Sequence, residues 1–309
     1  MRKLNYLSPT SLQIWEQNKE TFYLYYLADN KIPREPQTKP MSVGSAFDAY
    51  IKNYLYEILF GNNISTMDIR FRFENIFENQ VEEQNRDYAL EAGKKCFDAY
   101  IKSGAAADLI IELKMANDVP QFEFSVQRWI ESVSILGKPD LYFVNAKGKP
   151  IILDWKVNGY DSKWKTYPKR GYVKIRGTDK GQHKDAFVMD IGGVKVNVAE
   201  RLEIIDKTWA TQLATYAWLC GAMIGSDFIV TIDQLCCNGD DIKVAEHRLM
   251  IGKEFQKNTL IRYQELWSIV ESDWIFRDKS KEESMEICKM LDRRYEIYGN
   301  KDINMELLR

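Results

Sequence analysis

The residues best suited to chemistry lie together in the middle of the chain, beside two short apolar runs. Asp140 opens the first run, and Asp154 and Lys156 stand two positions apart at the end of the second. Because side chains alternate between the two faces of a strand, Asp154 and Lys156 point the same way. Carboxylates bind hard cations such as Mg²⁺, which activate water and stabilise charge on a phosphodiester, and a nearby ammonium neutralises developing negative charge. The alternative is that these are ordinary surface residues, since a D-x-K triplet arises by chance in many chains.

A β-hairpin would bring these residues together. The apolar runs 141–144 and 151–153 are predicted strands, and the polar Gly/Pro segment 145–150 is typical of the turn between them. Residues 121–136 alternate between apolar and polar and predict a strand that leads into the hairpin. Either Glu123 or Gln127 would then face the acidic residues, and the register that decides between them stays open.

Length and composition favour a soluble globular protein. The chain has 309 residues, 45% of them hydrophobic and 28% charged, with a net charge of −2. This balance predicts no general affinity for nucleic acid, so such a partner would need a local basic patch. No apolar run approaches the roughly 20 residues of a membrane span, and the first residues lack the apolar core of a signal peptide. We therefore expect a cytoplasmic protein with no membrane partner.

The cysteines and histidines favour neither disulfides nor structural zinc. There are five cysteines and two histidines, and no C-x-x-C pair occurs. The adjacent Cys236 and Cys237 fall in a predicted strand, where we expect them to pack.

A local basic patch does follow the acidic residues. Between positions 163 and 184 eight Lys or Arg residues accompany one acidic residue, Asp179. Lys and Arg neutralise phosphates, and interleaved aromatic rings stack on unpaired bases, whereas the simpler interpretation is a solvated loop. The candidate DNA contacts are Lys163, Lys165, Lys169, Arg170, Tyr172, Lys174 and Arg176.

Helical periodicity predicts several helices around this core. They span about 8–27, 42–60, 66–103 with a break near Gly93 or earlier, 207–222, 253–272 and 281–298. Ser8 or Thr10 would cap the first helix, and Asp206 would cap the helix over 207–222. Asp48 lies on the second helix beside its apolar stripe, and Gln212 and Tyr216 share one face of their helix. Strands are predicted at about 187–191, 194–198, 227–236 and 242–251, with Gly192-Gly193 as a tight turn.

Five of these elements, in chain order, give the sequence a resemblance to the RecB-like branch of the PD-(D/E)XK nuclease superfamily. An N-terminal S-P-x-S-L helix start is followed by a helix with G-x-x-x-H, here ending in Asp48. G-x-x-D then ends in Asp140, D-x-K comprises Asp154 and Lys156, and Q-x-x-x-Y comprises Gln212 and Tyr216. These motifs span residues 7–216.

The resemblance implies a metal-dependent DNA nuclease, with exonuclease action in end processing or recombination as the expected activity. It implies that Asp140, Asp154 and Lys156 are catalytic, with Gln212 and Tyr216 beside them. Asp48, Asp140 and Asp154 would bind Mg²⁺ or Mn²⁺, and Glu123 is a further candidate ligand. Asp48 replaces the family's histidine, which shifts the expected preference toward Mg²⁺.

The resemblance also implies an α/β (α+β) fold, with a mixed central β-sheet flanked by helices in a restriction-endonuclease-like core. We expect one nuclease domain over 1–309, with a helical part at 1–117. The catalytic core would span 118–252 with the basic insertion 157–186, and C-terminal helices would follow at 253–309. The cysteine spacing lacks the pattern of the iron–sulfur members, so no such cluster is expected.

The expected partners are DNA and, as a further candidate, a recombination or replication protein, in a bacterial or phage-infected cell. The alternative is a catalytically inactive DNA-binding or assembly protein that keeps the fold. The substitution of Asp48 for histidine motivates that alternative. A metabolic enzyme has little support, since the sequence lacks G-x-G-x-x-G, G-x-x-x-x-G-K-[ST] and G-x-S-x-G.

Overall fold

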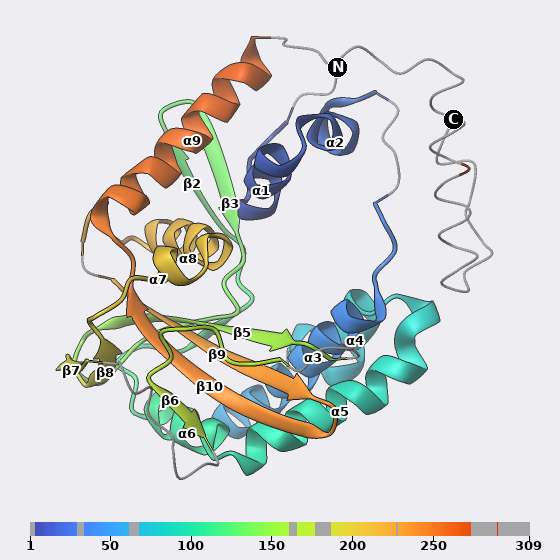
Figure 1. The fold of residues 1–309 in the computed structure, drawn as a ribbon, viewed down its shortest axis with the longest axis vertical. Coiled ribbons are helices and arrows are strands. Elements are labelled where there is room, and N and C mark those ends of the chain that lie inside the picture. Colours follow the sequence, from blue (N-terminus) through green and yellow to red (C-terminus); the bar gives the residue numbers. More distant parts are fainter. Residues whose placement is uncertain are drawn as a thin grey trace.

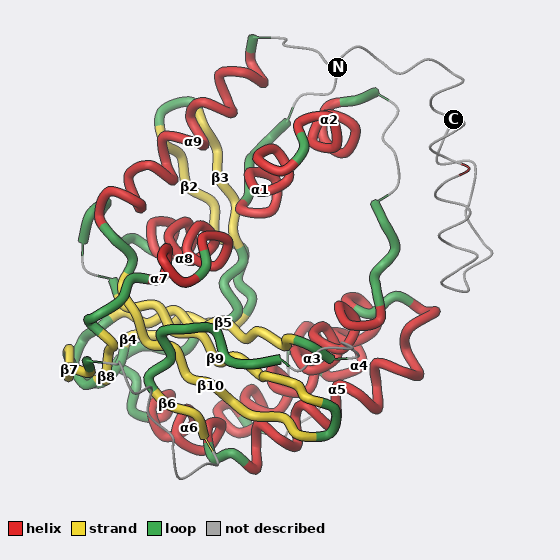
Figure 2. The backbone as a smooth tube through the Cα atoms, in the orientation of Figure 1, coloured by secondary structure: helices red, strands yellow, loops and turns green. Residues whose placement is uncertain are grey.

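The chain folds around one central sheet with helices on both faces (Figures 1 and 2). The computed structural model describes residues 4–29, 34–61, 68–160, 166–176, 187–226, 228–272 and 289. The helix predicted over 281–298 falls outside these ranges, apart from residue 289. The prediction of a mixed sheet flanked by helices is confirmed.

The central sheet has six strands in the order β1-β4-β5-β9-β10-β6. Their bounds are β1 Gln121–Phe122, β4 Leu141–Val144, β5 Pro150–Asn158, β9 Ile229–Asn238, β10 Asp241–Met250 and β6 Lys174–Arg176. Only β5 and β9 run parallel, and the other neighbours run antiparallel. The connection between the parallel pair carries helix α8 (Lys207–Leu219) across one face of the sheet.

The helices are α1 Pro9–Gln17, α2 Lys19–Phe22, α3 Lys39–Phe60, α4 Phe73–Gln80, α5 Arg86–Lys102, α6 Ala105–Lys114, α7 Leu202–Ile205, α8 Lys207–Leu219 and α9 Lys253–Glu271. A π-helical segment at Tyr23–Leu27 and two 3₁₀ turns at Ile69–Phe71 and Glu83–Asn85 complete the helical part. Ser8 caps α1 and Asp206 caps α8 through side chains that accept backbone N–H groups, as predicted. None of the described helices is long and apolar enough to cross a membrane.

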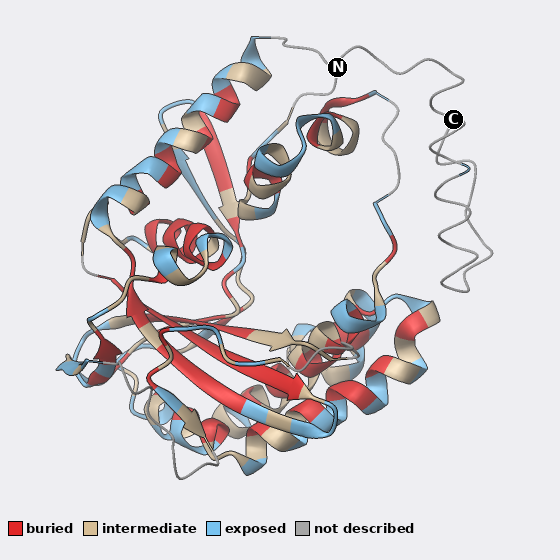
Figure 3. Cartoon of the chain, in the orientation of Figure 1, coloured by how far each residue is buried: buried red, intermediate tan, exposed pale blue. Residues whose placement is uncertain are grey.

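Alternation along β5 separates the two larger apolar cores. Ile151, Leu153 and Trp155 pack in the core beneath α3, α5 and α6. Ile152 points to the opposite face and packs in the core around α8 and α9. The strands between these layers are largely buried (Figure 3). A side chain on β5 therefore faces either α3 or α8 according to its position.

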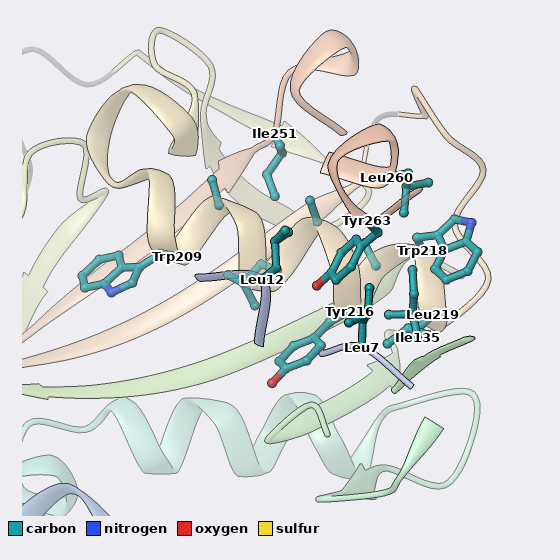
Figure 4. Packing of buried hydrophobic residues seen from close by; sticks show 14 of the residues in the cluster. Leu7, Leu12, Ile135, Trp209, Tyr216, Trp218, Leu219, Ile251, Leu260 and Tyr263 are labelled. Carbon is teal, nitrogen blue, oxygen red and sulfur yellow. The ribbon is translucent and has the colours of Figure 1, made fainter. Parts of the chain in front are cut away.

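The core around α8 joins elements that lie far apart in the chain. Its members include Leu7 and Leu12 from the N-terminus, Ile135 from strand β3 (Val133–Gly137) and Leu260 and Tyr263 from α9 (Figure 4). In the view of Figure 4, Tyr216 lies on the side of α8 opposite Ile251. This packing holds α8 against the sheet and fixes the direction of Tyr216.

The segment 121–136 is not one strand, contrary to the prediction. It forms β1, then β2 Val126–Ile130 and β3 Val133–Gly137, which pair as a separate hairpin. Backbone at positive φ turns the chain at Glu123 (φ 42°) and at Glu131 (φ 52°). Such values are uncommon outside glycine, so the apolar alternation could not reveal these turns.

The helical region predicted over 66–103, with a break near Gly93 or earlier, breaks at residues 81–85, before Gly93. Gly93 lies inside α5, where a Cβ atom would come within 2.5 Å of Ala46 Cβ on α3. This glycine therefore permits close helix packing and does not end a helix. Helix α6 and strand β6 were not predicted, whereas the hairpin of β7 Val188–Ile191 and β8 Val194–Asn197 was.

Candidate active site

The hairpin of β4 and β5 sets Asp140 beside the middle of β5. Leu141 pairs with Leu153, so the β4 ladder begins one residue before Asp154 on the facing strand. Asp140 Oδ2 accepts a hydrogen bond from the Trp155 backbone N–H at 3.3 Å. The acidic side chain thus covers the edge of β5 at the point where the pairing with β4 ends.

Asp154, Lys156, Gln212 and Tyr216 form a continuous polar chain from β5 to α8. The Lys156 ammonium lies 2.6 Å from Asp154 Oδ2 and donates to Gln212 Oε1 at 2.9 Å. Gln212 Nε2 donates in turn to the Tyr216 hydroxyl at 3.1 Å. The structure therefore brings together the two motifs that the sequence predicted to share a site.

Gly137 explains how Tyr216 can approach this chain. A Cβ atom at this position would lie 2.9 Å from the Tyr216 ring and 2.5 Å from Leu219 Cδ1. Any larger residue would displace the Tyr216 ring and the Leu219 side chain. The glycine of the G-x-x-D motif is thus a packing requirement of the site.

A second cluster joins Asp48 on α3, Glu123 after β1 and Asp140 before β4. One carboxylate oxygen from each lies within 4.8 Å of the other two, and no other such group of His, Cys, Asp or Glu occurs among the described residues. The Lys52 ammonium contacts all three, at 2.5 Å from Asp48 Oδ2, 2.7 Å from Glu123 Oε1 and 3.2 Å from Asp140 Oδ1. Asp140 therefore belongs to both clusters.

Glu123, and not Gln127, faces the acidic residues. The Glu123 N–H donates to the Asp140 carbonyl at 3.2 Å, which extends the pairing of β1 with β4 by one residue. Its carboxylate also accepts from Gln80 Nε2 at 3.0 Å. Gln127 lies on β2 and donates to Ser134 Oγ within the separate hairpin.

The pKa values of the ionisable groups of the site are shifted first by burial and then by the charges of their neighbours. Burial raises the pKa of Asp48 to about 7, and Lys52 opposes this rise. Burial likewise raises the pKa of Asp154 to about 6, and Lys156 opposes it. For Lys156 burial lowers the pKa, but Asp154 and Asp140 outweigh it, so that the pKa is raised and the side chain stays an ammonium.

The donor set fits a hard divalent cation. All the acidic groups offer carboxylate oxygens, which are the ligands that Mg²⁺ and Mn²⁺ prefer. Asp154 Oδ2 is buried, and the Lys156 ammonium lies 2.6 Å from it. The acidic residues thus offer the right kind of ligand atom, and the ammonium groups of Lys52 and Lys156 lie against some of these oxygens.

A pocket of about 190 Å³ opens beside the acidic residues. Its lining includes Asp48, Gln80, Asp140 and Trp155. A separate pocket of about 170 Å³ reaches Gln212 and is lined by residues of α1, α8 and α9. A larger pocket of about 550 Å³ lies elsewhere, between α6, β6 and the turns at Ala146 and Gly193.

The described part of the basic segment is partly paired with acidic residues. Lys169 lies 3.4 Å from Asp206, and Arg170 pairs with Glu200. Arg176 lies 2.6 Å from Asp108 and 2.9 Å from Glu246. Tyr172 packs edge-on to His247, and Lys174 lines the 550 Å³ pocket. Lys163 and Lys165 fall outside the described residues.

Sequence reasoning missed Lys52 and Gln80. Lys52 follows Asp48 by four residues on α3, so helical spacing alone places both on one face. Its complete burial beside three carboxylates depends on β1 and β4, which no local pattern reveals. Gln80 ends α4 in a segment whose polar composition gave no signal.

A second polar network supports β5 from the α5 side. Trp155 Nε1 donates to the Tyr100 hydroxyl at 3.2 Å, and that hydroxyl donates to Asp233 Oδ2 at 2.6 Å. Arg248 donates to Asp233 at 2.8 Å and to Glu246 at 3.3 Å. This network fixes the Trp155 ring, and with it the strand between Asp154 and Lys156.

Comparisons with known proteins add little to this geometry. A scan against protein-family models and a search of curated proteins found no match. A solved structure titled "Crystal structure of SSO0001" aligns with 86% of this chain and 78% of its own at 9% sequence identity. Its TM-score is 0.28, which is too low to carry an argument about fold or function.

Proposed function

We propose that the chain is a metal-dependent DNA nuclease with a restriction-endonuclease-like core, related to the RecB-like branch of the PD-(D/E)XK superfamily. The observation that carries the proposal is the chain of contacts from Asp154 through Lys156 to Gln212, with Asp140 beside it. These residues come from three separate motifs of the sequence. Their contacts with one another support the resemblance that those motifs suggested.

Asp140 and Asp154 would hold Mg²⁺ or Mn²⁺, with Asp48 and Glu123 as the further predicted ligands. The cation would supply an activated water and stabilise the negative charge on the phosphoryl oxygens. Lys156 is held as an ammonium, so it stabilises that charge and orients the water rather than removing its proton. Gln212 fixes the Lys156 ammonium, and Tyr216 fixes Gln212.

The proposed substrate is DNA, with hydrolysis at its ends as the favoured activity. Water adds to the phosphorus, the bond to one ester oxygen breaks, and that oxygen leaves as a hydroxyl. The pockets beside Asp140 and beside Gln212 give an extended strand two places to continue from the site. Lys169 and Arg170 would contact phosphates further along the strand.

A cleavage assay tests this proposal. Linear duplex with labelled ends, single-stranded DNA and covalently closed circles are incubated with Mg²⁺, Mn²⁺ or EDTA. We expect loss of the linear substrates with metal only, and at least about a thousandfold slower cleavage by Asp154→Ala and Lys156→Ala. Asp98→Asn, an exposed acidic residue on α5, serves as the matched control and keeps full activity. Full activity in Lys156→Ala would exclude the proposed mechanism.

A second candidate function is a non-catalytic DNA-binding or assembly protein. The observation that favours it is the Lys52 ammonium among Asp48, Glu123 and Asp140, where a metal ligand set was predicted. It predicts salt-sensitive DNA binding, with intact DNA under every metal condition. The same assay, run with a band-shift measurement, separates the two candidates.

A further inference from the structure

The pocket of about 550 Å³ lies apart from the candidate active site. It is lined by residues of α6, β6 and β10 (Figure 1), together with the turns that follow β4 and β7. It shares no lining residue with the pockets beside Asp140 and Gln212. Its volume falls within the range of roughly 300–1,000 Å³ that small-molecule sites occupy. The pocket therefore has room for a small ligand of its own.

The two arginines of this pocket are already paired with acidic side chains. Arg176 donates to both carboxylate oxygens of Glu246 at 2.9 Å and lies 2.6 Å from Asp108. Arg248 lies 2.8 Å from Asp233 and 3.3 Å from Glu246. The arginine side chains are only 14% and 17% exposed, so they hold the pocket together rather than wait for a ligand.

Three lysines add positive charge that acidic residues do not closely balance. Lys147, Lys174 and Lys195 all line the pocket. Lys174 and Lys195 form no ion pair with any residue that the structure describes, and Lys147 reaches Asp190 only at 4.0 Å, where both side chains are exposed. Lysine binds phosphate well, because its compact ammonium acts as a point charge. A phosphate group is thus the anion that this set of side chains favours.

Apolar side chains of α6 give the pocket a second kind of surface. Ile111 and Met115 are 58% and 59% exposed, and Leu109 and Val194 line the same pocket. Covering such side chains removes apolar area from water and is favourable. A ligand with an apolar or planar body would cover them.

Glu112 provides a hydrogen-bond acceptor in the same pocket. Its carboxyl forms no hydrogen bond or ion pair with any described residue. Partial burial raises the pKa of Glu112, and the charge of Arg248 opposes this rise. An ionised carboxylate only accepts hydrogen bonds, so it favours a ligand group that donates, such as the amino group of cytosine or adenine.

We propose that this pocket binds a mononucleotide whose base carries an exocyclic amino group. The phosphate lies against Lys147, Lys174 and Lys195, and the base covers the apolar side chains of α6. The amino group donates to Glu112. The site is separate from the proposed active centre, and its occupation requires neither a metal nor DNA cleavage.

Isothermal titration calorimetry with dCMP and dUMP, in EDTA at pH 8, tests the inference. The two nucleotides have the same size and charge, but dCMP carries an amino group where dUMP carries a keto oxygen. We expect dCMP to bind at least about fivefold more tightly than dUMP, and more tightly than deoxycytidine or inorganic phosphate. Equal affinity for dCMP and dUMP, or for dCMP and inorganic phosphate, would overturn the inference, as would no binding of dCMP at millimolar concentration.

Substitutions test whether the nucleotide occupies this pocket. Lys174→Ala combined with Lys195→Ala should weaken dCMP binding by about tenfold or more, because two charged contacts with the phosphate are lost. Glu112→Gln should still bind dCMP but lose the preference over dUMP, because an amide both donates and accepts. Unchanged affinity in the lysine variant, or an unchanged preference in Glu112→Gln, would overturn the inference.

The matched controls lie on α5, outside the pocket. Lys94→Ala combined with Lys95→Ala also removes two exposed lysines, and Asp98→Asn removes one exposed carboxylate. Both controls should bind dCMP and dUMP as the wild type does. The same losses in these controls would show a general effect of surface charge and overturn the inference.

An oligodeoxycytidylate of four residues tests the end of a DNA strand as the occupant instead. If it binds more tightly than dCMP and loses affinity in the same lysine variant, the pocket belongs to a strand and the free mononucleotide is excluded. Weaker binding than dCMP supports the inference.

The titration is independent of the proposed function, because it contains no available metal and measures no cleavage. Selective binding of dCMP by a protein that leaves DNA intact would support this inference and overturn the proposed function. Metal-dependent DNA cleavage without dCMP binding would do the reverse.

Discussion

The Lys156 ammonium donates to Gln212 Oε1 at 2.9 Å, which joins a strand and a helix that lie 56 residues apart in the chain. Gln212 has a second bond, to the Tyr216 hydroxyl one helical turn away. The Gln212 amide therefore couples the position of α8 to that of the ammonium on β5. The contacts run in one direction, from Tyr216 through Gln212 to Lys156, so Tyr216 acts on Lys156 only through Gln212.

This direction predicts how substitutions on α8 combine. Gln212→Ala should slow DNA cleavage by about 10- to 100-fold, the usual effect of losing a supporting partner of a site residue. Tyr216→Phe should have a smaller effect, since it leaves the bond between Gln212 and Lys156 in place. The double variant should cleave no more slowly than Gln212→Ala, measured as kcat on linear duplex DNA. Multiplicative effects would show that Tyr216 acts independently.

Metal affinity should depend on pH through the buried carboxyl of Asp154. Burial raises its pKa to about 6 in the folded protein, against about 3.9 for an unfolded aspartate. The neutral carboxyl thus stabilises the metal-free fold fully below about pH 4, and that contribution is lost as the pH rises through about 6. Asp48, with a pKa of about 7, acts in the same direction.

The expected result is that the melting temperature of the metal-free protein falls between roughly pH 5 and pH 8. Affinity for Mn²⁺ rises over the same range, by about tenfold per unit below pH 6, because the metal displaces one proton from Asp154. Thermal melts of the metal-free protein and titrations with Mn²⁺, each at several pH values, measure these two quantities. Asp154→Asn should abolish the steep part of the affinity curve, and an unaltered curve in that variant would contradict the assignment.

The elements that position the site were largely predictable, but the cluster around Lys52 was not. The β4–β5 hairpin, the α8 cap at Asp206 and the shared face of Asp154 and Lys156 all follow from local pattern. Nothing in the local sequence distinguishes Lys52 from other helical lysines. Its ion pairs have no sequence period, because its partners Glu123 and Asp140 lie 71 and 88 residues away.

Gly93 on α5 and Gly44 on α3 differ in the space available for a Cβ atom, and this difference gives a stability prediction. At Gly93 a new Cβ would lie 2.5 Å from Ala46 Cβ and 3.0 Å from its backbone, so Gly93→Ala must push α5 from α3. We expect a loss of about 1–3 kcal/mol in the free energy of unfolding. At Gly44 on α3 nothing lies within 4 Å of a new Cβ.

Gly44→Ala is therefore the matched control and should raise stability by up to about 1 kcal/mol through helix propensity. Chemical denaturation measures both variants. Equal stability of the two proteins would refute the close approach of α5 to α3 at this point.

The basic segment yields a prediction that separates phosphate contacts from structural ion pairs. Lys169 is half-exposed and lies 3.4 Å from Asp206 and 5.9 Å above the Trp209 ring, so its ammonium is accessible to a strand that passes α8. Lys169→Ala should weaken DNA binding and reduce the slope of log K against log salt by about 1, as for one lost phosphate contact. Lys94→Ala, an exposed lysine on α5, should leave that slope unchanged.

Arg176→Ala should behave differently, because Arg176 is largely buried between Asp108 and Glu246. Its removal leaves Glu246 without one of its two arginine partners, since only Arg248 remains beside it. We expect a loss of about 1–3 kcal/mol in unfolding free energy, with the salt slope of DNA binding changed less than in Lys169→Ala. Band-shift titrations at several salt concentrations, with thermal melts of the same samples, measure both quantities. A full unit of slope lost in Arg176→Ala without loss of stability would instead place its guanidinium on DNA.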